Sequence, residues 1–147
     1  KMSYGSGNIA KGPAMTRDEC IKILERSIET VGALAKEGRD IILTGEMGIG
    51  NTTTASAVTS VLLGKDPSEV TGRGAGLSGE TLKHKIEVIK KAISVNSPDR
   101  NDPIDVLSKV GGYDIIGMTG LFIGGAVYGI PVVIDGFISS IAAVAAG

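Results

Sequence analysis

The chain has 147 residues, of which 42% are hydrophobic and 21% are charged, and this length suits one domain with a packed core. The formal net charge is -1, which argues against a general electrostatic attraction to nucleic acid or to an anionic membrane. The single cysteine, Cys20, rules out an internal disulfide, and the single histidine, His84, has no cluster of metal-ligating residues around it, so no metal site is expected.

The first half of the chain is predicted to contain a helix, a strand, a glycine-rich turn and a second helix. The capping-box pattern at residues 16–19 predicts a helix that runs to about residue 37. The β-branched run at 41–43 is typical of a buried parallel strand. A glycine-rich turn follows at 45–52, and the small residues of 52–63 predict the next helix.

The second half repeats this order. A second glycine-rich turn at 71–78 precedes a helix expected over 79–95, with Ser78 as its N-cap. Pro103 suits the first position of a short helix that ends at Gly111. Two further strands are expected at 114–116 and 132–134, followed by helices at 120–128 and 137–146.

Strands that alternate with helices indicate an α/β fold, and we expect residues 1–147 to form a single nucleotide-binding domain. The expected architecture is a Rossmann-like three-layer sandwich with a mainly parallel sheet and right-handed crossovers. Ligands of such sheets bind beyond the carboxyl ends of the strands. The glycine-bearing turns that follow the three strands should therefore converge on one crevice.

A membrane-spanning helix is the competing interpretation of residues 115–134, which carry no charge. Against it stand Pro131 within this run and the acidic residues Asp114 and Asp135 at its ends. A buried strand, helix and strand account for the run better, so no membrane association is expected. No signal-peptide pattern is visible at Lys1, and we expect a cytoplasmic protein.

The turn at residues 45–52 has the context of a phosphate site, because it follows a strand and opens a helix whose first N–H groups are free. Its spacing matches the P-loop pattern G-x-x-x-x-G-K-[ST] except that Asn51 stands in place of the lysine. That lysine contacts the terminal phosphates of a nucleoside triphosphate, so its absence favours a monophosphate. A tight turn that binds no ligand is the alternative.

Three charged residues are candidates for the same site. Glu46, within the turn, could accept hydrogen bonds from ribose hydroxyls or stabilise positive charge on a sugar ring. Lys85 is expected on the flank of the apolar stripe of its helix, where it either reaches into the crevice or covers the edge of the core. Asp135 ends the last strand and either binds ligand or caps the next helix.

Five segments together resemble nicotinate-nucleotide:dimethylbenzimidazole phosphoribosyltransferases, in order and in spacing, over nearly the whole chain. The most specific segment is Gly45-Glu-Met-Gly-Ile-Gly-Asn-Thr-Thr-Thr-Ala55. The others are Gly-Pro-Ala-Met at 12–15, Thr-Gly-Arg-Gly-Ala-Gly at 71–76 with Lys85, Gly-Gly-Tyr-Asp-Ile at 111–115 and Pro-Val-Val-Ile-Asp-Gly-Phe-Ile at 131–138.

The resemblance implies a pentosyltransferase of cobalamin biosynthesis. Members transfer phosphoribose from nicotinate mononucleotide to a nitrogen of 5,6-dimethylbenzimidazole, and α-ribazole 5′-phosphate and nicotinate result. The resemblance implies these two small-molecule substrates, a homodimer, and no metal or organic cofactor. The protein must hold phosphate and ribose rigidly, tolerate positive charge at the sugar and deprotonate the azole.

The resemblance also assigns site residues. It places Glu46, as an assisting catalytic residue, and Gly48 in the nucleotide site, has Lys85 contact the anionic nucleotide, and has Gly136 line the ribose side. The helix-terminus amides would come from Gly74 and Ala75, and the turn and the last strand add Gly50, Asn51, Thr52 and Asp135.

Members of this family are longer than this chain. By resemblance, the general-base glutamate follows Gly147, and much of the benzimidazole pocket precedes Lys1. We therefore expect residues 1–147 to be a fragment that holds the nucleotide but is inactive alone. A non-catalytic mononucleotide-binding module and a degenerate P-loop NTPase are the alternatives.

Overall fold

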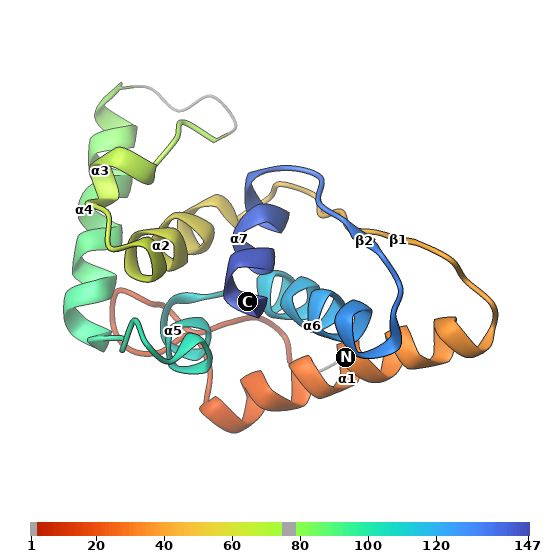
Figure 1. Cartoon of the computed structure of the whole chain (residues 1–147). Helices are drawn as coiled ribbons and strands as arrows, with labels where there is room; N and C mark the ends of the chain where they lie inside the picture. The colour runs from red at the N-terminus through yellow and green to blue at the C-terminus, as the bar shows by residue number, and fades with distance from the viewer. Residues whose placement is uncertain (1–2, 75–78) are drawn as a thin grey trace.

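The computed structural model describes residues 3–74 and 79–147 (Figure 1). In chain order the elements are α1 (Arg17–Lys36), β1 (Ile42–Leu43), α2 (Thr52–Leu63), α3 (Pro67–Val70), α4 (Gly79–Asn96), α5 (Pro103–Val110), α6 (Tyr113–Tyr128), β2 (Val132–Val133) and α7 (Phe137–Ala146). Figure 1 shows α4 at one end of the molecule and the β1–β2 pair toward the other, with α6 lying along α1 between them.

The capping box predicted at the start of α1 is confirmed. Thr16 Oγ1 accepts a hydrogen bond from the Glu19 N–H over 3.2 Å, and Glu19 Oε2 accepts one from the Thr16 N–H over 2.9 Å. The helices predicted at 52–63, 79–95 and 137–146 are also confirmed within a residue. The short α3 was not predicted; Asp66 caps it and Pro67 occupies its first turn.

The prediction of a strand at 114–116 is wrong, because these residues form the first turn of α6. Gly112 is the N-cap of α6 in an extended conformation, and no glycine turn interrupts the helix before Gly129. Ile115 and Ile116 are fully buried by tertiary packing, and this burial outweighs the preference of β-branched side chains for strands. The crevice therefore has no contribution from a turn at 117–120.

Close packing of α1 against α6 depends on glycines. A Cβ atom added at Gly120 would lie 2.6 Å from the Ser27 Cβ, and one at Gly124 would lie 2.8 Å from the Val31 Cβ. The glycines within the uncharged run at 115–134 are thus used for helix packing inside this domain. Among the described residues, none of the helices has the length and apolar character needed to cross a bilayer.

The two strands form a small parallel sheet. Ile42 pairs with Val132 and Leu43 pairs with Val133, so the strands predicted at 41–43 and 132–134 are confirmed, and the structure shows that they are neighbours. The first strand is buried only at Ile42, because Leu43 is 73% exposed. The described residues are otherwise mostly helical, and within them the three layers of a Rossmann-like sandwich are not seen. The coarser expectation, helices combined with a parallel sheet, is correct.

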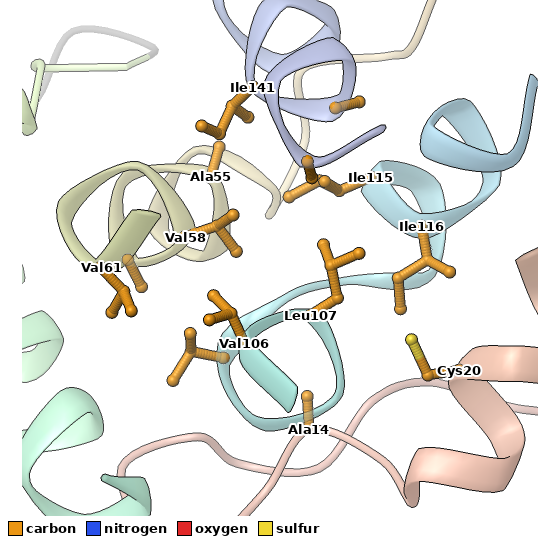
Figure 2. Close-up of a cluster of buried hydrophobic side chains, with 14 of the residues drawn as sticks. Ala14, Cys20, Ala55, Val58, Val61, Val106, Leu107, Ile115, Ile116 and Ile141 are labelled. Atoms are coloured by element: carbon orange, nitrogen blue, oxygen red, sulfur yellow. The ribbon is translucent and has the colours of Figure 1, made fainter. Parts of the chain in front are cut away.

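The main core lies where α1, α2, α5, α6 and α7 meet (Figure 2). Figure 2 shows the sulfur of Cys20 pointing toward Ile116, and Cys20 is fully buried. Burial raises the pKa of the Cys20 thiol to about 11, so this cysteine is a core residue and not a reactive thiol. The shared core fixes the starts of α2 and α6 relative to each other.

Candidate functional site

The glycine-rich turn between β1 and α2 is held at both ends. Thr44 Oγ1 donates a hydrogen bond to the Val133 carbonyl over 2.7 Å, which ties the start of the turn to β2. Gly48 and Gly50 have φ values of 69° and 73°, in the left-handed region that favours glycine. The turn therefore has a backbone that a sequence with bulkier residues at these two positions would not adopt without strain.

The carboxylate of Glu46 folds back over this turn. Its Oε2 accepts hydrogen bonds from the Gly48 N–H and from Asn51 Nδ2, the latter over 2.6 Å. The Gly48 amide, which the sequence pattern offers to a phosphate, thus binds a carboxylate of its own turn. The exposed Glu46 side chain is in consequence held in one orientation.

Asn51 is the N-cap of α2, yet its side chain makes no capping hydrogen bond. The amide Nδ2 instead donates to two carboxylates, to Glu46 and, over 2.7 Å, to Asp114 Oδ2. Asn51 is 7% exposed, and its Oδ1 is buried without a hydrogen-bond partner among the described residues. Both carboxylates only accept hydrogen bonds, so the NH₂ group of the amide, and not its oxygen, must face them.

Asp114 is a site residue that the sequence reasoning missed. It was placed at the start of a strand, but it lies in the first turn of α6 beside Asn51. The signal was present in Gly111-Gly112, which ends one helix and opens the next, followed by an acid in the first turn where the helix dipole favours negative charge.

A cavity of about 510 Å³ opens over these side chains. Its lining includes Glu46, Asn51, Tyr113 and Asp114. Across residues 3–74 and 79–147, no group of three or more His, Cys, Asp or Glu residues is arranged to hold a metal ion. Two carboxylates on one wall instead suit a ligand with hydroxyl donors or with positive charge.

Lys85 is buried, not placed on a flank. It lies on the buried face of α4 with Ile89, Ala92 and Asn96, and it is 7% exposed. Its Nζ donates to Thr52 Oγ1 over 2.9 Å and to the Gly72 carbonyl over 3.4 Å.

Burial lowers the pKa of Lys85, and no carboxylate among the described residues offsets this effect. A buried ammonium without an anionic partner is costly. This side chain is therefore the strongest candidate for an anion site in the described part of the chain.

A second cavity, of about 400 Å³, lies beside this lysine. Its lining includes Thr52, Gly72, Gly74 and Phe137. Gly74 has a φ of 56°, and a Cβ added there would lie 3.1 Å from Thr52 Oγ1 and 3.7 Å from Lys85 Nζ. Glycine thus keeps this cavity open. The predicted site residue Ala75 lies outside the described residues.

The turn after β2 reaches this second cavity through Phe137, but the predicted residues Asp135 and Gly136 line neither cavity. Ser139 Oγ accepts hydrogen bonds from the N–H groups of both, each over 2.9 Å. The N-cap of α7 is Gly136, with no side-chain capping bond, so the capping role that was weighed for Asp135 is not taken by that residue. The Asp135 carboxylate is exposed beside the strand end.

The predicted residues thus fall into two adjoining groups. Glu46, Gly50 and Asn51 line the first cavity, and the Gly48 N–H is bonded to Glu46 beside it. Thr52 and Gly74 line the second, and Lys85 Nζ donates to Thr52 at its edge while lining a smaller cavity of about 230 Å³. Asn51 and Thr52 are neighbours in sequence, so the start of α2 joins the two. One side of this double site is acidic and the other is cationic, which is the charge pattern that a zwitterionic ligand requires.

The phosphoribosyltransferase family model matches residues 1–147. A Ruminiclostridium cellulolyticum protein named nicotinate-nucleotide–dimethylbenzimidazole phosphoribosyltransferase is 58% identical over 99% of this chain and 42% of its own length. An Acetivibrio thermocellus protein with the same name is also 58% identical, with the same coverage of both chains.

The crystal structure of CobT from Thermus thermophilus is similar to this chain with a TM-score of 0.91. The identity is 36%, over 99% of this chain and 44% of that one. The chain thus spans less than half the length of the relatives it matches.

Proposed function

This chain belongs to the phosphoribosyltransferase family whose model matches residues 1–147, and we propose that the whole protein transfers phosphoribose from nicotinate mononucleotide to 5,6-dimethylbenzimidazole. The names of the relatives at 58% identity support this donor and this acceptor. The products would be α-ribazole 5′-phosphate, used in the lower ligand of cobalamin, and nicotinate. The single observation that carries the proposal is the buried Lys85 ammonium at the start of α2, next to the acidic cavity lined by Glu46 and Asp114.

The phosphate of nicotinate mononucleotide would bind at Lys85. Its buried ammonium has no carboxylate partner among residues 3–74 and 79–147, and a phosphate would supply the missing negative charge. The Thr52 hydroxyl, 2.9 Å from the ammonium, and the open backbone at Gly74 are placed to complete the anion site. Ala75, next in the chain, is proposed to add a backbone amide.

The ribose and the pyridinium would lie toward Glu46. Nicotinate mononucleotide already carries a positive charge on its ring nitrogen, and the bond to that nitrogen breaks as positive charge grows on the sugar. A carboxylate fixed beside the ribose stabilises that charge without reorganising during the reaction. Gly48 and Gly50 are proposed to let the ribose approach the turn, with Asp135 and Gly136 on its other side.

The azole would be bound and deprotonated by residues in the part of the relatives' length that this chain does not span. The same part is proposed to extend β1 and β2 into the mainly parallel sheet of a three-layer Rossmann-like sandwich. Leu43 is 73% exposed and Val133 is 42% exposed, so the small sheet has an apolar surface for such an extension to cover. We further propose a cytoplasmic homodimer that needs no metal or organic cofactor.

A triphosphate is a poorer ligand for this site. Asn51, at the position of the P-loop lysine, directs its amide at two carboxylates, and these repel additional phosphates. Calorimetric titration of the full-length protein with nicotinate mononucleotide and with ATP and Mg²⁺ tests this difference. We expect saturable binding of nicotinate mononucleotide only; a preference for ATP would instead support an NTPase.

A further inference from the structure

We propose that Asp114 is a positioning residue of this site, which holds Glu46 in its working orientation through the amide of Asn51. The inference rests on the proposed function, because it assigns Glu46 the part of facing the ribose. It adds a residue on α6 that touches neither reacting atom. Its effect passes through a hydrogen-bonded chain of three side chains.

The geometry carries the inference. One amide nitrogen, Asn51 Nδ2, lies 2.6 Å from Glu46 Oε2 and 2.7 Å from Asp114 Oδ2. The amide has two N–H bonds, so each carboxylate accepts one of them. Asp114 thereby fixes the plane of the amide, and the second N–H is aimed at Glu46 as a consequence.

The alternative role for Asn51, capping α2, is not used. Its side chain makes no capping hydrogen bond, although asparagine is among the favoured N-cap residues. The buried Oδ1 has no partner among the described residues, which is costly for a side chain that is 7% exposed. The amide oxygen therefore gives up the acceptor bond that capping would supply, and the two donor bonds to Glu46 and Asp114 fix the position of the amide.

Gly112 makes the approach of Asp114 possible. A Cβ atom added at Gly112 would lie 2.8 Å from Asp114 Oδ1 and 3.4 Å from Thr54 Oγ1. Its backbone is extended, a conformation open to any residue, so the demand for glycine comes from these contacts. The N-terminus of α6 is in this way fitted around the carboxylate of Asp114.

A double-mutant cycle in the full-length protein tests the inference. The variants are Asp114→Ala, Glu46→Ala and the combination, with α-ribazole 5′-phosphate formation measured as kcat/KM for nicotinate mononucleotide. Asp114→Ala should lower kcat/KM about tenfold or more in the wild-type background, because a hydrogen bond to a charged group is lost. In the Glu46→Ala background the same change should cost less than about twofold. Equal losses in both backgrounds would show that Asp114 does not act through Glu46.

Two further variants separate positioning from a general effect on the fold. Asp114→Asn keeps an oxygen that accepts from Asn51, so it should retain at least about a third of the wild-type kcat/KM; a loss as large as that of Asp114→Ala would overturn the inference. Asp40→Ala removes an exposed carboxylate in the loop before β1 and serves as the matched control.

Failure of the proposed function gives a different result. A full-length wild-type protein that forms no product from the two proposed substrates contradicts that function. The role of Asp114 in orienting Glu46 is then tested by structure and not by activity. A crystal structure of Asp114→Ala then decides: the Glu46 carboxylate should leave the Asn51 amide, and an unmoved Glu46 contradicts the inference.

Discussion

Lys85 Nζ donates a hydrogen bond to Thr52 Oγ1 over 2.9 Å, and this bond joins the second turn of α4 to the first residue of α2. The lysine is 7% exposed and lies on the same face of its helix as the buried residues Ile89 and Ala92. The hydrogen bond to Thr52 holds the Lys85 ammonium in one position at the edge of a cavity. Because Thr52 follows Asn51, the same bond also connects this cation to the acidic cavity.

Lys85→Met should weaken the binding of nicotinate mononucleotide by about 2 kcal/mol, because a charge-assisted bond to the phosphate is lost. The unliganded fold should keep or gain stability, since an apolar side chain replaces a buried ammonium that no described carboxylate pairs with. Calorimetry and urea unfolding of the full-length protein measure the two effects. Lys83→Met, on the exposed face of the same helix, is the control, and equal affinity in wild type and Lys85→Met would contradict the phosphate assignment.

The pKa of Lys85 also predicts a pH dependence. Burial lowers this pKa in the folded state below its usual value of 10.5, so between the two values the unfolded chain binds more protons than the folded one. The contribution of Lys85 to the free energy of unfolding should therefore rise with pH across that window.

Urea unfolding at several pH values above neutrality, in the absence of ligand, measures this rise. Lys85→Met should remove it, whereas Lys83→Met should not. The binding of nicotinate mononucleotide should change in the opposite sense and weaken as the ammonium loses its proton. A pH response that is the same in wild type and Lys85→Met would assign the effect to other groups.

Gly112→Ala should lower transferase activity with little loss of stability. The new methyl group would lie 2.8 Å from Asp114 Oδ1, and a carboxylate at the end of a side chain can rotate away at low cost. The Asn51 amide then loses one of its two anchors. Gly12→Ala, where an added Cβ meets nothing within 4 Å, is the control. Activity of Gly112→Ala equal to that control would contradict the role of the Asp114 contact.

Two glycines of α6 should respond in opposite ways to alanine. A Cβ at Gly120 would lie 2.8 Å from the Leu24 carbonyl oxygen, so Gly120→Ala should destabilise the domain by about 1–3 kcal/mol despite a better helix propensity. A Cβ at Gly117 would be 3.8 Å from Ser27 Oγ, an ordinary contact, so Gly117→Ala should be neutral or stabilising by up to about 1 kcal/mol. Urea midpoints compare the two, and equal shifts would contradict the packing of α1 on α6.

The elements that local signals determine were predictable from the sequence. The capping box at Thr16 and Glu19 and the proline at Pro103 lie at helix starts, and the structure places the helices there. The run Ile115-Ile116 was assigned to a strand because periodicity does not distinguish a short buried strand from a buried helix. Its conformation is decided by α1, whose distance in sequence hides it from local reasoning.

The site divides in the same way. The turn at 45–52 was recognisable because its glycines, its preceding strand and its following helix are contiguous. The Asn51–Asp114 bond joins residues 63 positions apart, so only the fold brings the two together. The burial of Lys85 was underestimated because a helical projection centred on apolar residues treats a lysine as an edge residue.

The most direct test of the proposed function is the product that the full-length protein forms from nicotinate mononucleotide and 5,6-dimethylbenzimidazole. Chromatography with mass and NMR analysis identifies both the product and the configuration at its anomeric carbon. We predict α-ribazole 5′-phosphate and nicotinate in equal amounts, with inversion at that carbon. Release of nicotinate without transfer to the azole, or no turnover by a protein that binds both substrates, would contradict it.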